Sequence, residues 1–215
     1  MHRNEKNKLI TELLQQAESI AILPSKIGGV DTFCAGVGLF HILKKAEKKV
    51  QLIYTGRIPE GCENIIKAED ITANAKHRDL VVAIDYSGTD VEKVQYNTEG
   101  STFYLRLGPV PRDFDMNKVR SVIEGHKNDV YIIIGAHTPE DLGATYTEME
   151  KEIVTGKIIN LDNTDRNTRY GHFNIVDPLK DSMSLLMLHS ILDWEFAVTT
   201  EAAQAFLIGI SHRKQ

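Results

Sequence analysis

The chain has 215 residues, of which 42 % are hydrophobic and 26 % are charged, as is ordinary for a soluble globular protein. This length can form one well-buried core, or one domain with a small appendage. The formal net charge of −5 argues against binding to duplex nucleic acid, because affinity for a phosphate backbone usually requires a basic face. A small anionic ligand in a local positive pocket remains compatible with this charge.

The cysteine content and the absence of targeting signals indicate a cytoplasmic protein. The two cysteines, Cys34 and Cys62, do not form a CxxC pair, which favours free thiols in a reducing compartment. Residues 1–20 are amphipathic and lack the apolar core of a signal peptide. No apolar run approaches the roughly 20 residues that span a membrane, so we expect no membrane association.

Along the chain, short apolar runs alternate with helical patterns, which is typical of a parallel sheet covered by helices. The runs predict buried strands because they are short and β-branched. They lie at 19–23, 50–54, 80–85, 130–134 and 157–161. Helices are predicted at about 5–17, 32–48, 114–125, 148–154, 181–192 and 200–210, and Thr199 or Thr200 can cap the last of them. The sequence therefore predicts an α/β fold with a mainly parallel five-stranded sheet.

One stretch interrupts this alternation. Residues 91–95 and 102–107 flank the sequence NTEG, which is typical of a β-hairpin turn, and two prolines follow. We interpret residues 91–112 as a hairpin inserted after the third strand. No linker or internal repeat is visible, so we predict a single domain over 1–215 with an N-terminal helix in 1–17.

The first candidate site is the sequence PSKIGGVD at residues 24–31, between the first strand and its helix. Ligands of parallel α/β proteins gather at the carboxyl ends of strands, and a helix N-terminus favours an anion. Ser25, Gly28 and Gly29 are therefore candidate phosphate-binding residues, and Asp31 is a candidate metal ligand. Alternatively, Asp31 caps its helix and the glycines only form a turn.

A second candidate is Asp85, which ends the predicted strand 80–85. If this strand belongs to the sheet, the carboxylate of Asp85 faces the same edge as Asp31. Two such carboxylates can share a divalent cation. Alternatively, Asp85 starts a turn before Ser87 and Gly88.

The third candidate is the polar loop NLDNTDRNTRYG at 160–171, which follows the fifth predicted strand. Arg166 and Arg169 can grip a phosphate, and His172 sits beside the loop. Alternatively, the loop is solvated and its Asn and Asp side chains satisfy their own backbone. His137 follows the fourth predicted strand but is not counted in the site.

Taken together, these segments resemble the DHH phosphoesterase superfamily. Residues 158–178, IINLDNTDRNTRYGHFNIVDP, resemble the family signature N-I-D-H-H-P-S-N-x-x-F-G-x-x-N-x-V-D-P. Residues 20–50 resemble the family's first loop, helix and strand, and 134–143 resemble an exopolyphosphatase-related subgroup that is close to the oligoribonucleases. The resemblance extends over about 18–210 and implies the N-terminal domain of such an enzyme. It also implies that the family's C-terminal substrate-binding domain is absent.

This sequence departs from the family pattern at several metal-binding positions. The family's first His and first Asp fall on Ser25 and Gly29, and its signature His pair falls on Asn163 and Thr164. A further family Asp falls near Arg213. Hydroxyl and amide groups are poor replacements for imidazole as ligands of a Mn-type ion.

The resemblance retains three carboxylates, Asp31, Asp85 and Asp162. It implies that Asp85 alone would hold the first metal, and that Asp31 and Asp85 would hold the second. Mn²⁺ or Mg²⁺ binding is therefore expected to be weak or absent, and no other cofactor is expected. If the chain is active, Asp162 is the residue expected to take part in catalysis.

The sequence leads to the prediction of a DHH-like pseudoenzyme that acts as a binding or assembly protein. Its expected ligand is a nucleotide, a short oligonucleotide or a protein, and self-association as a homodimer is expected. The apolar faces of the last two predicted helices, which include Leu192, Phe206 and Leu207, are the expected contact surface. The alternative is a residual Mn- or Mg-dependent phosphoesterase acting on short oligonucleotides, nucleotides or polyphosphate.

Overall fold

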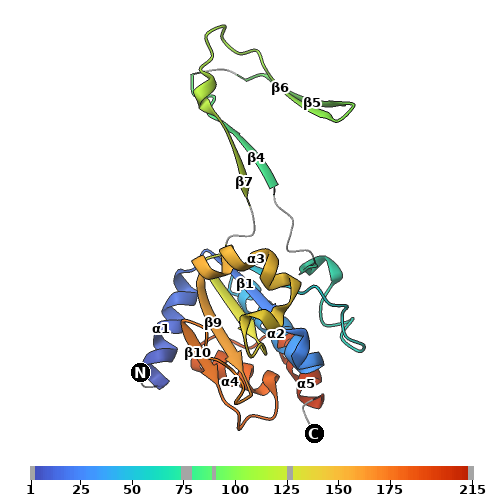
Figure 1. Ribbon diagram of the computed structural model, residues 1–215, viewed down its shortest axis with the longest axis vertical. Coiled ribbons are helices and arrows are strands. Elements are labelled where there is room, and N and C mark those ends of the chain that lie inside the picture. The colour runs from blue at the N-terminus through green and yellow to red at the C-terminus, as the bar shows by residue number, and fades with distance from the viewer. Residues whose placement is uncertain (1–2, 74–78, 89–90, 125–127, 213–215) are drawn as a thin grey trace. The chain divides into compact units, whose positions relative to one another are not determined.

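The computed structural model describes residues 3–73, 79–88, 91–124 and 128–212. The chain forms two compact units (Figure 1). The first unit combines residues 1–77 with 126–215, and the second comprises 78–125. The insertion is therefore wider than the predicted hairpin at 91–112.

The first unit is built on a six-stranded sheet in which every neighbouring pair is parallel. The strand order is β10-β9-β8-β1-β2-β3. The predicted α/β class and mainly parallel sheet are confirmed, with six strands in place of five. The bounds are β1 Ser19–Pro24, β2 Lys49–Ile53, β3 Ile71–Thr72, β8 Val130–Ile134, β9 Lys157–Asp162 and β10 Phe173–Val176.

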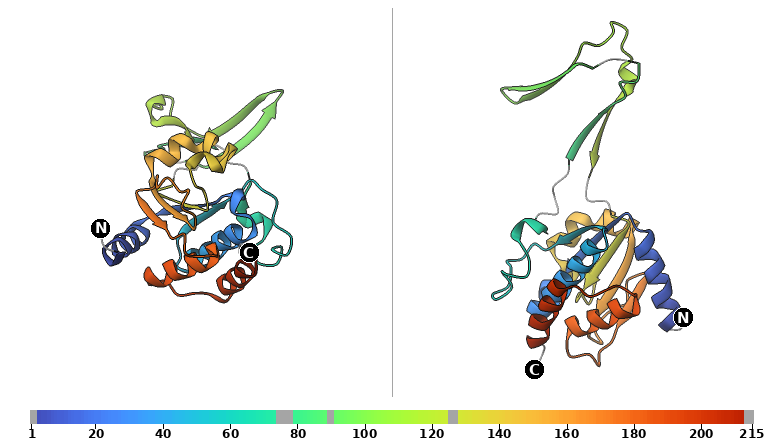
Figure 2. Two further views of the ribbon diagram at one scale, coloured as in Figure 1. Left: turned by 60° about the horizontal axis from the view of Figure 1, so that its bottom comes forward. Right: turned by 180° about the vertical axis from the view of Figure 1, so that it is seen from behind.

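Helices cover both faces of this sheet (Figures 1 and 2). Alternate side chains of β1 enter different buried clusters, with Ile22 on one face and Leu23 on the other. The face of Ile22 is covered by α1 (Arg3–Gln16), α2 (Gly29–Lys45), α4 (Met183–Asp193) and α5 (Thr200–Ser211). The opposite face is covered by α3 (Ala144–Thr155), which contributes Met149 and Ile153.

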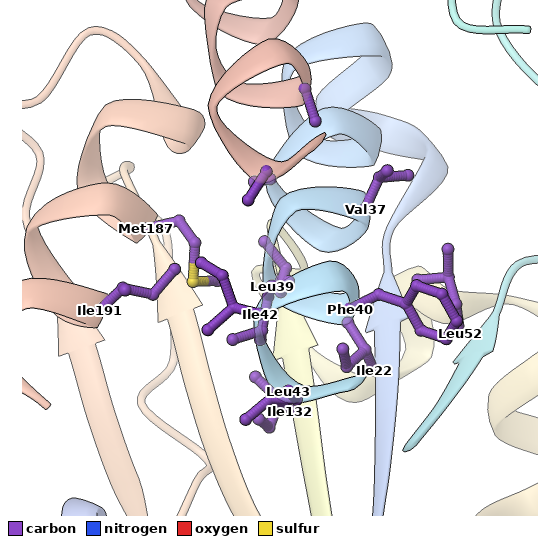
Figure 3. Packing of buried hydrophobic residues seen from close by; sticks show 14 of the residues in the cluster. Ile22, Val37, Leu39, Phe40, Ile42, Leu43, Leu52, Ile132, Met187 and Ile191 are labelled. Atoms are coloured by element: carbon purple, nitrogen blue, oxygen red, sulfur yellow. The ribbon is translucent and has the colours of Figure 1, made fainter. Parts of the chain in front are cut away.

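Helix α2 is the central helix of the larger cluster. Figure 3 shows Met187 and Ile191 of α4 pointing towards Ile42 of α2, with Leu43 above Ile132 of the sheet. The stretch Lys26–Lys45 is long and apolar enough to cross a membrane. However, 67 % of its most apolar 18-residue segment is buried within the protein. Its composition is therefore explained by packing on several sides.

Helix α5 lies directly on α2. A Cβ atom at Gly38 would come within 2.2 Å of the Phe206 ring, so the glycine permits this close approach. The Thr199 hydroxyl accepts a hydrogen bond from the Ala202 amide at 3.1 Å, as the predicted helix cap requires. Of the residues predicted for partner binding, Phe206 is consequently buried within the unit. Leu192 and Leu207 remain exposed.

The second unit contains two antiparallel pairs, which corrects two predictions. Strand β4 (Asp79–Ile84) pairs with β7 (Val119–Glu124), not with the central sheet. The helix predicted at 114–125 is wrong, because β-branched Val119 and Val122 favour the extended β7 and only a short 3-10 turn precedes it. The predicted hairpin is confirmed as β5 (Lys93–Glu99) and β6 (Thr102–Gly108).

Candidate functional site

The carboxyl ends of β1, β8 and β9 lie side by side in the sheet. Three segments leave these ends: the turn at 25–31, the segment at 135–142 and the loop at 163–172. Ligands of parallel α/β proteins bind at this edge, so these segments contain the candidate site.

Ser25 links two of the segments. It is buried, and its hydroxyl accepts a hydrogen bond from the Ile27 amide at 3.3 Å. The same hydroxyl donates to the carbonyl of Asp141 at 3.3 Å. The hydroxyl therefore caps the 3-10 turn Lys26–Gly28 and ties it to the segment after β8.

The two glycines have clear backbone roles. A Cβ atom at Gly28 would lie 1.7 Å from the Thr32 hydroxyl oxygen. Gly29 has a φ of +62°, which side-chain-bearing residues rarely adopt, and faces open space. These constraints match the turn-forming alternative, and a phosphate contact at Gly28 or Gly29 stays a prediction.

Asp31 caps a helix other than its own. Oδ2 accepts the Met183 amide at 2.6 Å, and Oδ1 accepts the Ser184 amide at 2.9 Å. Oδ1 also accepts the Ser182 hydroxyl at 3.2 Å, and the side chain is buried. The carboxylate thus satisfies two of the free N–H groups at the start of α4 and complements the positive end of its dipole. Its predicted role as a metal ligand would compete with these bonds.

Asp162, buried at the end of β9, pairs with the part-buried His137 in the segment after β8. The distance between His137 Nδ1 and Asp162 Oδ2 is 2.9 Å. An ionised carboxylate only accepts hydrogen bonds, so Nδ1–H is the donor and Nε2 is left for another partner. His137 was not among the residues predicted for the site. Its position shortly after a buried strand was the signal for including it.

Asparagine side chains hold the loop at 163–172 against the sheet. Asn160 Nδ2 donates to Oδ1 of Asn167 at 2.8 Å and to Oδ1 of Asn174 at 2.9 Å. Asn167 Nδ2 donates to the Ala136 carbonyl and to Asp162 Oδ2, both at 2.9 Å. Hydrogen bonds therefore hold the loop to the segment after β8, to β9 and, through Gly171 and Asn174, to β10, unlike the solvated loop that was the alternative interpretation.

Tyr170 extends this network. Its hydroxyl donates to the Ala136 carbonyl at 3.2 Å. Burial, with additional repulsion from Asp162 and Asp141, raises the pKa of the Tyr170 phenol. The phenol therefore stays protonated at ordinary pH and acts as a hydrogen-bond donor.

Asn163 and Thr164, which occupy the positions of the signature histidine pair in the family that the sequence resembles, form hydrogen bonds with the backbone. Asn163 Nδ2 donates to the Lys180 carbonyl at 3.0 Å, and the Thr164 hydroxyl accepts the Arg166 amide at 3.3 Å. The side chains of Arg166 and Arg169 are exposed and make no ion pair within the described ranges. Their guanidinium groups remain available for an anion.

The structure separates His172 from this edge. Its Nδ1 accepts the amide of Ile158, near the amino end of β9, at 3.1 Å. His172 therefore lies at the opposite end of the strand from Asp162. The two residues are close in sequence, but the loop at 163–172 runs back along the sheet between them.

Asp85 belongs to the second unit. Its Oδ1 accepts the Ser87 amide at 2.9 Å, and this hydrogen bond lowers the pKa of the exposed carboxyl group. This matches the turn-starting alternative, and a metal shared with Asp31 stays a prediction.

Among the residues that the structure describes, no three His, Cys, Asp or Glu side chains gather as a metal site. Arg213 lies outside the described residues.

No family model and no curated protein matches this chain. A solved structure does: an exopolyphosphatase-related protein from Bacteroides fragilis superposes with a TM-score of 0.62 at 15 % identity. The chain has the fold of that protein. The match covers 98 % of this chain but 51 % of the other, so the chain spans about half of its length. At this identity the likeness shows the fold alone.

Proposed function

We propose that this chain binds a phosphate-bearing ligand at the carboxyl edge of its sheet and does not hydrolyse it with two metal ions. The hydrogen bonds of Asp31 are the observation that argues against two-metal hydrolysis. Two-metal hydrolysis requires two cations about 3.5–4 Å apart, held by several side chains whose ligand atoms are free to coordinate them. Both oxygens of Asp31 instead accept hydrogen bonds at the start of α4.

The cationic side chains support the first part. Arg166 and Arg169 are exposed on the loop that follows Asp162, and the asparagine network holds this loop in place. Lys26 is exposed on the turn after β1, the neighbouring segment of the same edge. A guanidinium presents two parallel donors to phosphate oxygens, so a nucleotide or short oligonucleotide is the proposed ligand class.

Calorimetry tests the phosphate proposal with adenosine monophosphate and a short RNA as probes. We expect Arg166→Ala and Arg169→Ala each to weaken binding by about tenfold, as befits a charge-assisted contact of about 1.4 kcal/mol. Arg112→Ala, an exposed arginine of the second unit, is the matched control and should leave binding unchanged. Equal binding by all three variants would refute a site at this loop.

A titration with Mn²⁺ and Mg²⁺ tests the absence of two-metal chemistry. We expect no site with submicromolar affinity, and turnover of short RNA, cyclic dinucleotides, phosphoadenosine phosphate or polyphosphate below about 1 s⁻¹, near the low end of ordinary enzymes. Two submicromolar Mn²⁺ sites together with faster turnover would overturn this part of the proposal.

A residual phosphoesterase is the second candidate, and the His137–Asp162 pair favours it. A histidine oriented through Nδ1 by a buried carboxylate can use Nε2 as a general base. On this candidate His137→Gln would abolish hydrolysis, whereas His189→Gln on α4 would not. A hydrolysis rate that His137→Gln leaves unchanged would exclude this mechanism.

A further inference from the structure

The β5–β6 hairpin has one apolar and one polar face. Residues directly opposite each other in an antiparallel pair point to the same side. The pairs Val94–Leu107, Tyr96–Leu105 and Thr98–Phe103 therefore share a face that carries no formal charge. The intervening pairs place polar side chains on the other face: Lys93, Gln95, Asn97, Glu99 and Arg106, with Tyr104 among them.

The apolar face of the hairpin is exposed. Tyr96 is 75 % exposed, and Val94 and Phe103 are each 63 % exposed. The rings of Tyr96 and Phe103 stack across the strands at a centroid distance of 5.9 Å. Neither of the buried clusters contains a residue of the second unit, so this face contributes to no core among the described residues.

Such a face needs a partner for two physical reasons. A lone two-stranded hairpin is marginal in water, and three or more strands with a covered apolar face are needed for stability. The exposed apolar side chains also amount to on the order of 500 Å², near the upper end of the patches seen on monomers. With the backbone and rim of both strands, the face approaches the ~800 Å² per partner of a standard interface.

We propose that a second copy of this chain covers the face, with the two hairpins packed face to face about a two-fold axis parallel to the strands. This arrangement makes a four-stranded, two-layered unit with one shared core. It requires no charge complementarity, which suits a face without formal charges.

The sizes of the side chains fit this axis. Rotation about it places β5 of one copy over β6 of the other, so that each residue meets the residue that faces it across its own hairpin. Tyr96 then meets the partner's Leu105, and Phe103 meets the partner's Thr98. Each aromatic side chain opposes a smaller one, as two interdigitating layers require. The alternative axis, across the strands, would set Tyr96 against the partner's Tyr96.

Light scattering of the full chain at micromolar concentration tests the proposal. The expected mass is twice the 24.1 kDa of one chain. Tyr96→Glu should reduce the mass to that of the monomer, because it buries an unpaired charge in the shared core. Tyr104→Glu places the same charge on the polar face, and Leu207→Glu places it on α5; both variants should remain dimeric.

Cross-linking tests the axis. Thr98→Cys and Phe103→Cys, prepared separately and then mixed, should form a mixed dimer with a short thiol cross-linker. Each variant alone should cross-link poorly. The proposal fails if the native chain is a monomer, if Tyr96→Glu stays dimeric, or if Tyr104→Glu dissociates as readily as Tyr96→Glu. A dimer lost through Leu207→Glu alone would assign the interface to α5.

Discussion

At the scale of single residues, the clearest case is Asp31. The local sequence places it in the first turn of a helix, where an acidic residue is expected to cap that helix. The carboxylate instead caps α4, whose first residues lie about 150 positions further along the chain. Only the tertiary structure brings these groups together, so no local pattern could predict the contact.

Asp31→Ala is therefore expected to destabilise the protein. The change leaves the amides of Met183 and Ser184 buried without their acceptor, and we expect the free energy of unfolding to fall by about 2 kcal/mol. Urea denaturation measures this, with the exposed Asp165→Ala as a control that should change stability by less than about 0.5 kcal/mol. A stable Asp31→Ala protein would show that the cap is dispensable.

The two cysteines allow a test at the same scale. Cys34 Sγ and Cys62 Sγ are 3.6 Å apart and both residues are buried. Burial, reinforced by Cys62 and Asp31, raises the pKa of the Cys34 thiol. Since the thiolate is the reactive form, a raised pKa means slow alkylation at pH 8. Mass spectrometry after iodoacetamide treatment should show both thiols free in the native protein and modified in urea. Rapid native modification would contradict this burial.

At the scale of elements, the sequence predicted the strands that are buried on both faces. The runs at 19–23, 130–134 and 157–161 became β1, β8 and β9 with ends shifted by at most one residue. The run at 80–85 looked the same but paired antiparallel in the second unit. Local composition shows that a segment is extended but not which strand it pairs with. The partner of 80–85 is β7, and this strand was missed because a helix was predicted at 114–125.

The contact between α2 and α5 gives an element-scale prediction. Gly38→Ala should lower stability by about 1–3 kcal/mol, because the added methyl overlaps the Phe206 ring, although alanine favours helices. Chemical denaturation measures the change. In a Phe206→Leu background the overlap shrinks, so the same substitution should cost less. Additive effects in this double-mutant cycle would rule out the proposed clash.

At the scale of the whole molecule, the first unit builds its buried clusters from its own residues. All members of both buried clusters belong to the first unit. Deleting residues 93–108 and closing the gap with a short Gly-Ser segment should therefore change the stability of the first unit by less than about 1 kcal/mol. Hydrogen exchange of the β8 amides measures this stability. A large loss of protection would show that the hairpin supports the first unit.

The central place of β1 affects how the chain can fold during synthesis. Ile22 pairs with Ile132, so β1 cannot gain its β8 neighbour until the whole insertion has left the ribosome. Helices α4 and α5, which cover α2, emerge later still. The nascent chain thus carries an open strand edge and a bare apolar helix for most of its translation, the kind of surface that chaperones bind. The β5–β6 hairpin pairs residues that are close in sequence, so it can form before β1 pairs with β8.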